Sequence, residues 1–437
     1  MTRHFFKKLY YDIVPFHRRY GKEFKKTLDI IEETQWYSLK ELKQYQLNQL
    51  NKLLNHSYET VPYYTKVFKD LNLTPDDINS TKDLSKLPIL TKDIIRNNWD
   101  DLQSTKSYTE KVYNFSTSGS TGNPLTFLGN DDVYKREAAF ILRAYRSHGA
   151  NLYDTKSIWL RRYVPGKNEP LYKYDDELKR MYLSAYHLSK DNIEDYVSMI
   201  NSYNSELLVA YPSSIYILAL LMENNNLKLK NIKYIHTASE KMLPQWSNKV
   251  EEVLGIKPKS HYGMMEKVSM FFQCDHSDMY HESLEYGVTE IVDNYVVGTG
   301  FLNYTMPFIR YKTNDVATKN TKNKKCKCGR GLPLSVKDFD GRSDDILITK
   351  DGRYIPAVNF YTMMYKLNNI DMFQIIQRKR NKIDVNIKVK EKFNQEKKLK
   401  KELENRLGSI KLNINYVDNI ERDKNTQKIR CIVNECI

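Results

Sequence analysis

Hydroxyl residues and glycines are concentrated in one short stretch of the chain, from Asn114 to Phe127. Glycine lets the backbone come close to an anion, successive N–H groups can form an anion-binding nest, and hydroxyls add donors that suit tetrahedral oxygens. The stretch lacks the Gly-Lys-Ser/Thr ending of a Walker loop. We therefore expect a different kind of phosphate-binding loop, with a flexible Ser/Gly linker as the alternative. The residues expected to contribute are Ser116, Thr117, Ser118, Gly119, Ser120, Thr121 and Gly122.

The five cysteines of the chain are placed unevenly, and none precedes Cys274. Their odd number, without a secretion signal, argues against a disulfide framework. Cys326 and Cys328 lie one residue apart among basic residues that favour thiolates, and six residues separate Cys274 from His281. These four side chains are a common donor set for structural zinc. His276 is the competing imidazole, and reduced, unliganded thiols are the alternative.

The composition is that of a folded protein: hydrophobic residues make up 41% and charged residues 28% of the 437 residues. No window reaches the roughly 18–20 unbroken apolar residues of a membrane span. No apolar stretch with a cleavage site follows the basic N-terminus, so we expect a cytoplasmic location. The net charge is +15, but no nucleic-acid-binding motif focuses it. We therefore do not expect nucleic acid as a partner, and a basic nucleic-acid-binding protein is a remote alternative.

Alternating helical and strand-like segments must position these residues. Ser38 and Glu41 form a capping-box pattern at the start of an amphipathic segment. Short apolar runs alternate with stretches of helical periodicity, which indicates an α/β domain. Helices are predicted over 38–58, 134–148 and 215–223, and strands over 207–210 and 232–236.

The character of the sequence changes after about Arg342. Apolar and polar residues alternate over 383–389, as in a half-buried strand, and again over 412–416. Between them, Leu399, Leu403 and Leu407 lie on one helix face, and Gly408 suits the helix end. A chain of this length needs more than one domain. We predict a large N-terminal α/β domain over residues 1–341, with a helical N-terminal segment and a zinc-binding insert, and a small α+β domain over 342–437.

The stretch Ser-Thr-Ser-Gly-Ser-Thr-Gly-Asn-Pro at 116–124 resembles the phosphate loop of the adenylate-forming superfamily, which includes acyl-CoA synthetases, luciferases and peptide-synthetase adenylation domains. The nearest branch contains the phenylacetate-CoA ligases and the CapK-like proteins of capsular polysaccharide biosynthesis. Leu125 follows the proline, as is common in that branch, where many members of the superfamily have lysine. Further motifs follow in the family's order, and the branch often carries the same cysteine and histidine pairs around zinc. The resemblance thus covers nearly the whole chain and implies that a hinge joins the two domains.

The resemblance implies a role in nucleotide binding for two further motifs. Tyr-Gly-Met-Met-Glu is similar to the family's Tyr-Gly-x-x-Glu, so Tyr262 and Gly263 belong to the adenine contact and Glu266 holds Mg²⁺. The segment that ends at Asp315 is similar to Pro-Leu-Ile-Arg-Tyr-x-Thr-Gly-Asp, whose aspartate accepts hydrogen bonds from both ribose hydroxyls. From the residues alone, the alternatives are a tight turn with an exposed acid for Glu266 and an Asx-type turn for Asp315.

Two positions before the hinge depart from the family pattern. Ser239-Glu240 resembles the Gly-Glu element of the adenine pocket, but serine replaces the usual glycine. Asn314 replaces the glycine before Asp315, and asparagine also tolerates left-handed backbone. Tyr-Pro-Ser ending at Ser213 either lines the cleft or forms a strand-to-helix turn with the serine as cap.

The resemblance also implies a hinge and a catalytic lysine. Gly-Arg-Ser-Asp-Asp at 341–345 is similar to the motif between the two domains, with Arg342 contacting the ribose or phosphate and Asp344 or Asp345 taking up the rotation. Lys428 matches the lysine that reaches the carboxylate and α-phosphate during adenylation, although Gln427 stands where glycine is usual. Lys424 is the rival, and a basic terminal surface is the alternative.

The implied activity has two steps. A carboxylate attacks the α-phosphorus of ATP with Mg²⁺, giving an acyl-adenylate and pyrophosphate, and an acceptor then attacks the acyl carbon. The acceptor is coenzyme A if the chain behaves as a phenylacetate-CoA ligase, or a sugar, amine or carrier if it serves surface polysaccharide biosynthesis. A non-catalytic nucleotide-binding relative is the alternative. The sequence identifies neither the acid nor the oligomeric state, and it leaves a monomer and a homodimer open.

Overall fold

The structure is a computed structural model of the 437-residue chain. It describes residues 14, 16–106, 111–117, 125–161, 163–166, 168–321, 325–340, 346–356, 358–364, 367–389, 392–420 and 431–436. The chain divides into two compact units, each built from three separate segments. Unit 1 consists of Met1–Thr117, Thr126–Asp154 and Lys259–Gly341, and unit 2 of Ser118–Leu125, Thr155–Pro258 and Arg342–Ile437. Among the residues described, no helix has both the length and the apolar character that a membrane crossing requires.

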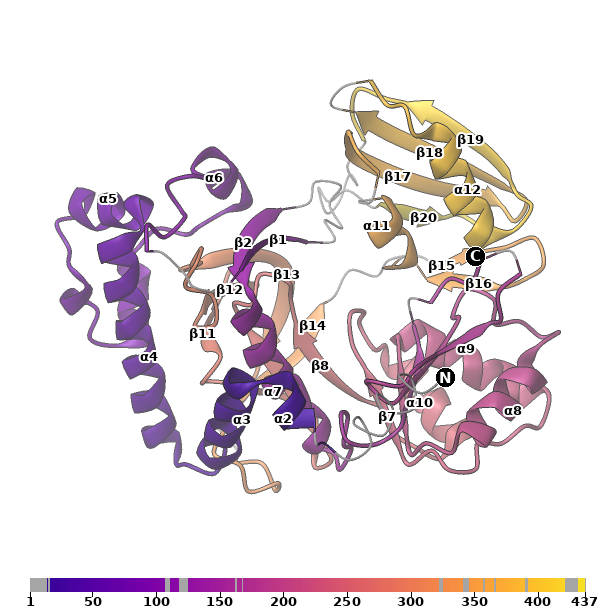
Figure 1. The fold of residues 1–437 in the computed structure, drawn as a ribbon, viewed down its shortest axis with the longest axis horizontal. Coiled ribbons are helices and arrows are strands. Elements are labelled where there is room, and N and C mark those ends of the chain that lie inside the picture. Colours follow the sequence, from indigo (N-terminus) through magenta and orange to yellow (C-terminus); the bar gives the residue numbers. More distant parts are fainter. Residues whose placement is uncertain are drawn as a thin grey trace. The chain divides into compact units, whose positions relative to one another are not determined.

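Helices form the first part of unit 1 (Figure 1). They are α2 (Phe16–Tyr20), α3 (Lys22–Thr34), α4 (Leu39–Thr60), α5 (Pro62–Asp70), η1 (Pro75–Asp77), η2 (Thr81–Lys86), α6 (Lys92–Asn97) and, further along the chain, α7 (Asp131–Arg146). The predicted capping box begins α4: the Glu41 N–H donates to the Ser38 hydroxyl over 3.3 Å, and the Ser38 N–H donates to the Glu41 carboxylate over 2.8 Å. Two of the predicted helices, 38–58 and 134–148, are confirmed with shifts of one to three residues at their ends.

Antiparallel strands form the second part of unit 1. In spatial order they are β11 (Gly287–Val292), β12 (Tyr295–Gly300), β13 (Tyr311–Lys319), β14 (Leu334–Asp340), β10 (Ser277–Glu282), β9 (Met270–Cys274) and β8 (Lys259–Gly263). A separate hairpin pairs β1 (Val112–Ser116) with β2 (Thr126–Asn130). The sequence-based prediction did not identify these strands.

A buried ion pair joins the helices of unit 1 to the segment before β11. Arg143 donates to both carboxylate oxygens of Glu285, over 2.7 and 3.2 Å, and both side chains are 1% exposed. The Thr34 hydroxyl also donates to Glu285 over 2.8 Å. Arg143 further donates to the Ile31 carbonyl. Because a buried charge is costly unless it is paired and hydrogen-bonded, this cluster fixes α3 and α7 against one another.

A parallel sheet is the centre of unit 2, in the order β7 (Tyr234–Thr237), β6 (Leu207–Ala210), β3 (Ser157–Leu160) and β5 (Arg180–Leu183). The edge strand β4 (Tyr172–Asp175) is antiparallel to β5. Helices α8 (Ile193–Tyr203), α9 (Pro212–Asn224) and α10 (Pro244–Leu254) supply much of the surrounding core. The predicted strand 207–210 and helix 215–223 are confirmed, and the strand predicted at 232–236 runs from Tyr234 to Thr237.

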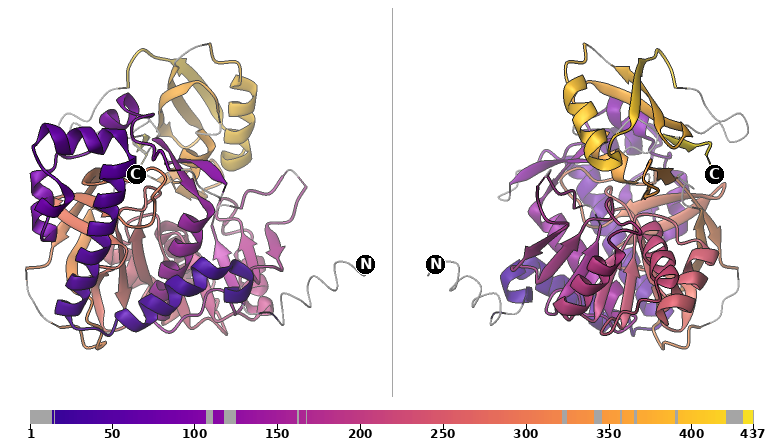
Figure 2. Two further views of the ribbon diagram at one scale, coloured as in Figure 1. Left: turned by 60° about the vertical axis from the view of Figure 1, so that its left-hand side comes forward. Right: turned by 90° about the vertical axis from the view of Figure 1, so that its right-hand side faces the viewer.

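The C-terminal part of unit 2 has its own sheet, with the order β19 (Lys411–Tyr416), β18 (Lys382–Val389), β17 (Ile370–Lys379) and β20 (Ile432–Asn434). Figure 2 shows α12 (Glu396–Leu407), in yellow, along one face of this sheet. Leu399, Leu403 and Leu407 of α12 are buried in its core, as their spacing predicts. Tyr416 is 52% exposed, so the alternation predicted for 412–416 fails at its last residue. The short strands β15 (Ile346–Ile348) and β16 (Tyr354–Pro356) pair before α11 (Val358–Met364).

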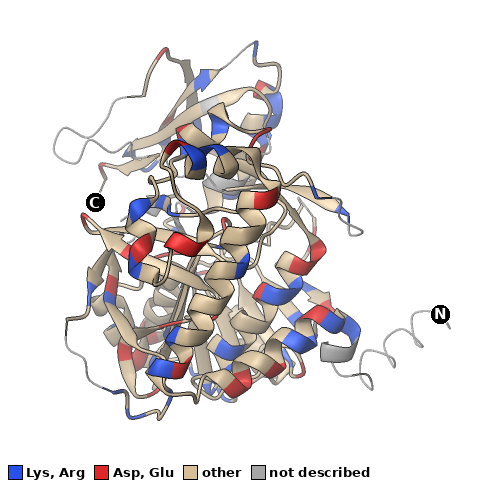
Figure 3. Cartoon of the chain, turned by 90° about the vertical axis from the view of Figure 1, so that its left-hand side faces the viewer, with Lys and Arg blue, Asp and Glu red and all other residues tan. Residues whose placement is uncertain are grey.

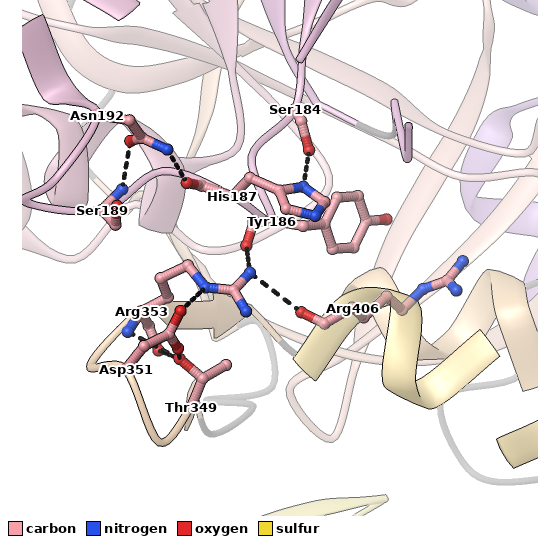
Figure 4. A network of polar contacts seen from close by, with 9 residues as sticks. All are labelled: Ser184, Tyr186, His187, Ser189, Asn192, Thr349, Asp351, Arg353 and Arg406. Atoms are coloured by element: carbon pink, nitrogen blue, oxygen red, sulfur yellow. Dashed lines mark hydrogen bonds and ion pairs between the residues drawn. The ribbon is translucent and has the colours of Figure 1, made fainter. Parts of the chain in front are cut away.

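Within unit 2, Arg353 connects this C-terminal part to the loop between β5 and α8 (Figure 4). Its guanidinium donates to the backbone carbonyls of Tyr186 and Arg406, and its Nε donates to Asp351 over 2.8 Å. Arg353 is 8% exposed. In the same loop, the His187 ring lies 2.9 Å from the Ser184 hydroxyl. Burial, reinforced by the nearby Arg353 charge, lowers the pKa of His187 to about 4.

The architecture is mixed α/β, as predicted, and the C-terminal part of the chain has a sheet of its own. Basic and acidic residues are interspersed along the same helices and strands in the view of Figure 3. The compact units differ from the predicted domains, because 155–258 and 342–437 fall in one unit. The division at 341/342, as a boundary between moving domains, stays a prediction.

Candidate active site and metal centre

The predicted phosphate loop connects the two strands of the β1–β2 hairpin. Ser116 ends β1, and the next residue, Thr117, is buried. Phe115 and Phe127 face each other across the hairpin, buried and stacked with ring centroids 5.4 Å apart. Residues 118–124 lie outside the described part of the chain. The strands on either side of the predicted loop are thus paired and packed against each other, and the phosphate-binding role of the loop stays a prediction.

Tyr262 and Asp315, which the resemblance assigns to adenine and ribose, are in direct contact. The Tyr262 hydroxyl donates to Oδ2 of Asp315 over 2.7 Å. Its ring stacks on Phe339, with centroids 3.8 Å apart and planes 4° from parallel. Burial, and next the Asp315 carboxylate, hold the pKa of Tyr262 well above its usual range, so the phenol remains a donor. No described residue donates to Oδ1 of Asp315, which therefore keeps its full acceptor capacity.

Glu266 is positioned by a second tyrosine. The Tyr311 hydroxyl donates to Oε1 of Glu266 over 2.8 Å, and burial together with that carboxylate raises the pKa of Tyr311. Lys267, the next residue, has a left-handed backbone with φ of 57°. A Cβ at Gly300 would lie 2.2 Å from the Lys267 carbonyl oxygen, so only glycine lets β12 approach this turn. The turn expected from the residues is present, but its acid is half-buried and partnered.

Ser239 and Glu240 lie in unit 2, after the carboxyl end of β7. Ser239 has φ of 76°, the left-handed backbone that glycine adopts without strain. Arg161 donates to the Ser239 hydroxyl over 2.8 Å. Glu240 accepts from the Ser213 N–H over 3.1 Å and from its hydroxyl over 2.6 Å. A carboxylate in this place stabilises the first turn of α9. The strand-to-helix turn is therefore present, but Tyr211, not Ser213, is its N-cap.

The three cysteines and one histidine expected to bind zinc are gathered in unit 1. The donor atoms of Cys274, His281, Cys326 and Cys328 all lie within 4.8 Å of one another. The Cys274 and Cys326 sulfurs are 3.6 Å apart, and Cys328 Sγ lies 3.5 Å from His281 Nε2. Tetrahedral zinc–sulfur bonds of about 2.3 Å place two sulfurs roughly 3.8 Å apart, so the donor set fits zinc. His276, the competing imidazole, is exposed and is not among the four.

The surroundings of the four donors also favour a metal. His281 Nδ1 lies 2.9 Å from the Leu332 carbonyl, which directs Nε2 toward the sulfurs, the usual support of a metal-bound histidine. The hydrogen bond from Cys274 holds the pKa of the Cys328 thiol well below its usual range and raises that of Cys274 itself.

The cysteine loop is joined to the corner between α3 and α4. Arg330 Nε donates to the Gln35 side chain over 2.8 Å, and the Gly331 N–H donates to the Gln35 carbonyl over 2.9 Å. A Cβ at Gly331 would lie 1.7 Å from the Tyr37 carbonyl oxygen. The loop therefore attaches the N-terminal helices to the strands that carry Cys274 and His281.

Comparisons with known proteins bear directly on this arrangement. A family model described as the CapK C-terminal domain matches residues 347–435. Protein CapK of Staphylococcus aureus is 24% identical over 405 residues, which cover 90% of this chain and 88% of CapK. Phenylacetate-coenzyme A ligase of Pseudomonas putida is 23% identical over 340 residues, covering 73% of this chain and 75% of that enzyme. The chain is a homologue of CapK and of the phenylacetate-CoA ligases.

Solved structures agree with these homologies at the level of the fold. A 2-hydroxyisobutyryl-CoA ligase in complex with 2-HIB-AMP and CoA superposes with a TM-score of 0.61 at 16% identity, covering 92% of both chains. The resemblance predicted from the sequence is thus confirmed in its relatives, which are CapK and phenylacetate-CoA ligases, and these homologues support the predicted enzyme class of adenylate-forming ligase. The predicted fold class is confirmed by the solved structure.

Several residues assigned from the family's motifs lie outside the described part of the chain. Arg342 of the hinge motif, Lys428 and its rival Lys424 are among them. So are Ser118, Gly119, Ser120, Thr121 and Gly122 of the phosphate loop. Gly263 is described, and a side chain there would meet no atom within 4 Å. The nucleotide and metal roles of all these residues stay predictions.

Sequence reasoning missed the residues that hold the motifs in place. Tyr311 lies in the motif that ends at Asp315, but the motif did not indicate that Tyr311 positions Glu266. In the same motif, Arg310 is engaged by Glu290 through two hydrogen bonds of 2.9 Å and is not available to a ligand. Arg161, which contacts Ser239, lies in none of the motifs identified in the sequence. The one available signal was its position directly after an apolar strand, Ser157–Leu160.

Proposed function

We propose that this protein activates a carboxylic acid as its acyl-adenylate, with release of pyrophosphate, and passes the acyl group to coenzyme A. The contact between Tyr262 and Asp315 carries the proposal. It unites the two residues that the family's motifs assign to the nucleoside, although 53 positions separate them. The homologues support an adenylate-forming CoA ligase as the enzyme class.

Asp315 would bind the ribose of ATP. Its Oδ2 already accepts from Tyr262, while Oδ1 and the second lone pair of Oδ2 can accept from a vicinal diol. The Tyr262 ring is held by Phe339 on one face, which fixes the aromatic surface beside the ribose position. A preformed donor and acceptor arrangement lowers the cost of ordering the nucleotide.

Glu266 would be the protein carboxylate that holds Mg²⁺. Mg²⁺ takes few carboxylates and shares its remaining coordination with phosphates and water. Tyr311 occupies Oε1 of Glu266, and no described residue donates to Oε2. The ion would neutralise charge on the triphosphate during attack by the carboxylate. Lys428, with Lys424 as the rival, would supply a further positive charge, and the hinge at Arg342 would let the C-terminal domain move between the two steps.

Carboxylate-dependent exchange between ATP and labelled pyrophosphate tests the first step. An acid panel should reveal exchange with at least one acid, and Asp315→Asn should lower kcat/KM for ATP by about 10- to 100-fold, as expected when a hydrogen bond to a charged group is lost. Asp293→Asn is the matched control, because Asp293 is exposed in the turn between β11 and β12 of the same unit.

Two results would count against adenylation. Exchange absent across a broad panel, with ATP still bound, would favour a non-catalytic relative. Equal loss in Asp315→Asn and Asp293→Asn would separate the activity from the proposed ribose contact. Lys428→Ala and Lys424→Ala, compared in the same assay, identify the adenylation lysine, because only one of them should abolish exchange.

We also propose that Cys274, His281, Cys326 and Cys328 bind one structural zinc ion. Four protein donors leave no open position, which is the pattern of a structural site and not of a catalytic one. Elemental analysis should give one zinc per chain, and Cys326→Ser should abolish it and lower the melting temperature. Cys436→Ser is the matched control, since that thiol is far from the cluster in the sequence and belongs to unit 2. A metal-free protein with the same melting temperature as the zinc-bound protein would contradict the structural role.

The final acceptor and the biological role are a finer proposal. CoA is favoured because four phenylacetate-coenzyme A ligases are among the homologues. A role in surface polysaccharide biosynthesis is favoured by the CapK match over 90% of the chain. Product analysis by mass spectrometry, with CoA offered beside amino sugars in one reaction, separates the two: formation of only the acyl-sugar would overturn CoA as acceptor.

A further inference from the structure

A buried arginine without a carboxylate partner lies at the carboxyl edge of the parallel sheet of unit 2. Arg161 directly follows β3 and is 9% exposed. Its hydrogen-bond partner is the Ser239 hydroxyl, 2.8 Å away. Its Nε is buried without a partner, and no acid of the described chain lies within ion-pair distance of it. Such a charge is costly to bury, so a group that brings a negative charge to it would be bound strongly.

Two aromatic rings lie beside the guanidinium and stabilise its charge where no acid does. Its central carbon lies 4.6 Å from the Tyr211 ring centroid and 5.7 Å from that of Trp159. A cation over aromatic rings is stabilised without being neutralised. The surroundings of Arg161 thus stabilise its positive charge, and no carboxylate of the described residues occupies the guanidinium, which remains able to bind an anion.

The position of Arg161 is one where ligands bind in sheets of this kind. From β3 the chain passes through β4 to β5 on one side, and then to β6 and β7 on the other side. The strand order therefore reverses at β3, and ligands of open α/β sheets bind beyond the carboxyl ends of the strands at such a reversal. Arg161 follows β3, Tyr211 follows β6, and Ser239 follows β7, so all three lie on that edge.

We infer that Arg161 selects an acid substrate that carries a second anionic group, such as a dicarboxylate. This inference rests on the proposed function, because Ser239, which Arg161 contacts, belongs to the element assigned to the nucleotide pocket. The reacting carboxylate must reach the α-phosphate, so the group left for Arg161 is the distal one. A planar guanidinium can bind a distal carboxylate through two parallel hydrogen bonds, which a hydroxyl or methyl group cannot replace.

Matched acids test the inference. Succinate, glutarate and adipate are compared with butyrate, valerate and hexanoate in the exchange assay and in thermal-shift binding without ATP. The wild-type protein should prefer at least one diacid over its matched monoacid, and Arg161→Gln should raise the KM for that diacid by about 10- to 100-fold with little change in the KM for ATP. Arg161→Lys should recover only part of the loss, because an ammonium cannot bind both oxygens in the same plane.

Arg180→Gln is the control variant. Arg180 is also 9% exposed and also lies over Trp159, at 4.1 Å, but it begins β5 and so is at the opposite edge of the sheet. A selective effect of Arg161→Gln, absent in Arg180→Gln, supports the inference. Equal weakening of monoacids and diacids would mean that Arg161 binds the reacting carboxylate, and a raised KM for ATP alone would mean that it binds phosphate. Either result overturns the second-anion role.

The binding arm distinguishes failure of this inference from failure of the proposed function. If exchange is absent with every acid but a diacid still stabilises the wild-type protein and not Arg161→Gln, the anion site stands and adenylation does not. If exchange occurs with monoacids and no diacid is preferred or bound, adenylation stands and the inference is wrong.

Discussion

Arg143 and Arg161 are both buried arginines, but only the first has a carboxylate partner. Arg143 in unit 1 is held by both oxygens of Glu285, while Arg161 in unit 2 has the Ser239 hydroxyl and two aromatic rings. In both arginines Nε lacks a hydrogen bond. The two residues therefore differ in whether a carboxylate balances the charge, not in the hydrogen bonding of Nε. Arg143 stabilises the fold through its ion pair with Glu285. Arg161 retains a charge that the described protein does not neutralise, as a residue meant for a ligand would.

The largest expected effect comes from breaking the ion pair between Arg143 and Glu285. Glu285→Gln leaves the Arg143 charge buried without its counter-ion and should lower the free energy of unfolding by about 3–5 kcal/mol, as measured by urea denaturation. The double variant Arg143→Met/Glu285→Leu removes both charges and should recover much of that loss. A single variant as stable as the wild type would show that Arg143 does not depend on Glu285.

Histidine differs from arginine because burial can make it lose its positive charge. Burial, and next the Lys259 ammonium, lower the pKa of His148 in unit 1 to about 4. The unfolded chain, with an imidazole pKa of about 6.5, binds a proton that the folded chain does not. Stability should therefore fall as the pH is lowered from about 6.5 to about 4, by up to about 3 kcal/mol for His148.

Denaturation at several pH values measures this loss, with His148→Gln as the comparison. The variant should lose part of the dependence between pH 6.5 and 4. His187 in unit 2 has a similarly lowered pKa, but it is half-buried, so solvent screening makes its share smaller. Identical pH profiles for the wild type and His148→Gln would contradict the assignment.

A smaller effect separates hydrogen bonding from backbone strain beside Arg161. Ser239→Ala and Ser239→Gly both remove the acceptor for Arg161, but only glycine relieves a φ of 76°. Left-handed backbone costs a non-glycine residue roughly 1–2 kcal/mol, so the glycine variant should be about 1 kcal/mol more stable than the alanine variant. Calorimetry on the two proteins measures the difference. Equal stability would mean that the chain rearranges around position 239.

The smallest expected effect on the free energy of unfolding comes from an ion pair that is exposed to solvent. Lys25 and Asp29 form an ion pair on α3 with 52% and 60% of their side chains exposed. Lys25→Ala should change the free energy of unfolding by less than about 0.5 kcal/mol, since exposed pairs contribute little. A loss comparable with that of Glu285→Gln would remove the contrast between buried and exposed charges.

The sequence predicted those parts of the fold that depend on local patterns. The capping box at Ser38, the alternation over 383–389 and the leucine spacing of α12 each depend on neighbours a few residues away. The antiparallel strands of unit 1 escaped prediction because several of them are fully or nearly fully buried. Met270–Cys274 and Tyr295–Gly300 are examples with hardly any polar alternation.

The candidate site divides in the same way. Tyr262, Glu266 and Asp315 could be identified because they lie in compact motifs. Tyr311 and Phe339 could not, because their roles arise only when strands distant in the sequence are paired. Arg161 could not be identified for the same reason. The sequence around an arginine that follows a strand does not show whether a carboxylate from a distant part of the chain pairs with it.

The attachment of the cysteine loop to the α3–α4 corner has a consequence for how the chain is made. Gln35 and Arg330, which are hydrogen-bonded, are 295 residues apart. At about 5–20 residues per second, the corner is synthesised roughly 15–60 s before the loop that secures it. For most of that interval α3 and the corner after it have neither Glu285 nor Arg330 to hold them. The first helices of unit 1 to leave the ribosome are therefore among the last to become fixed, and this is the period in which a chaperone would be most useful to the nascent chain.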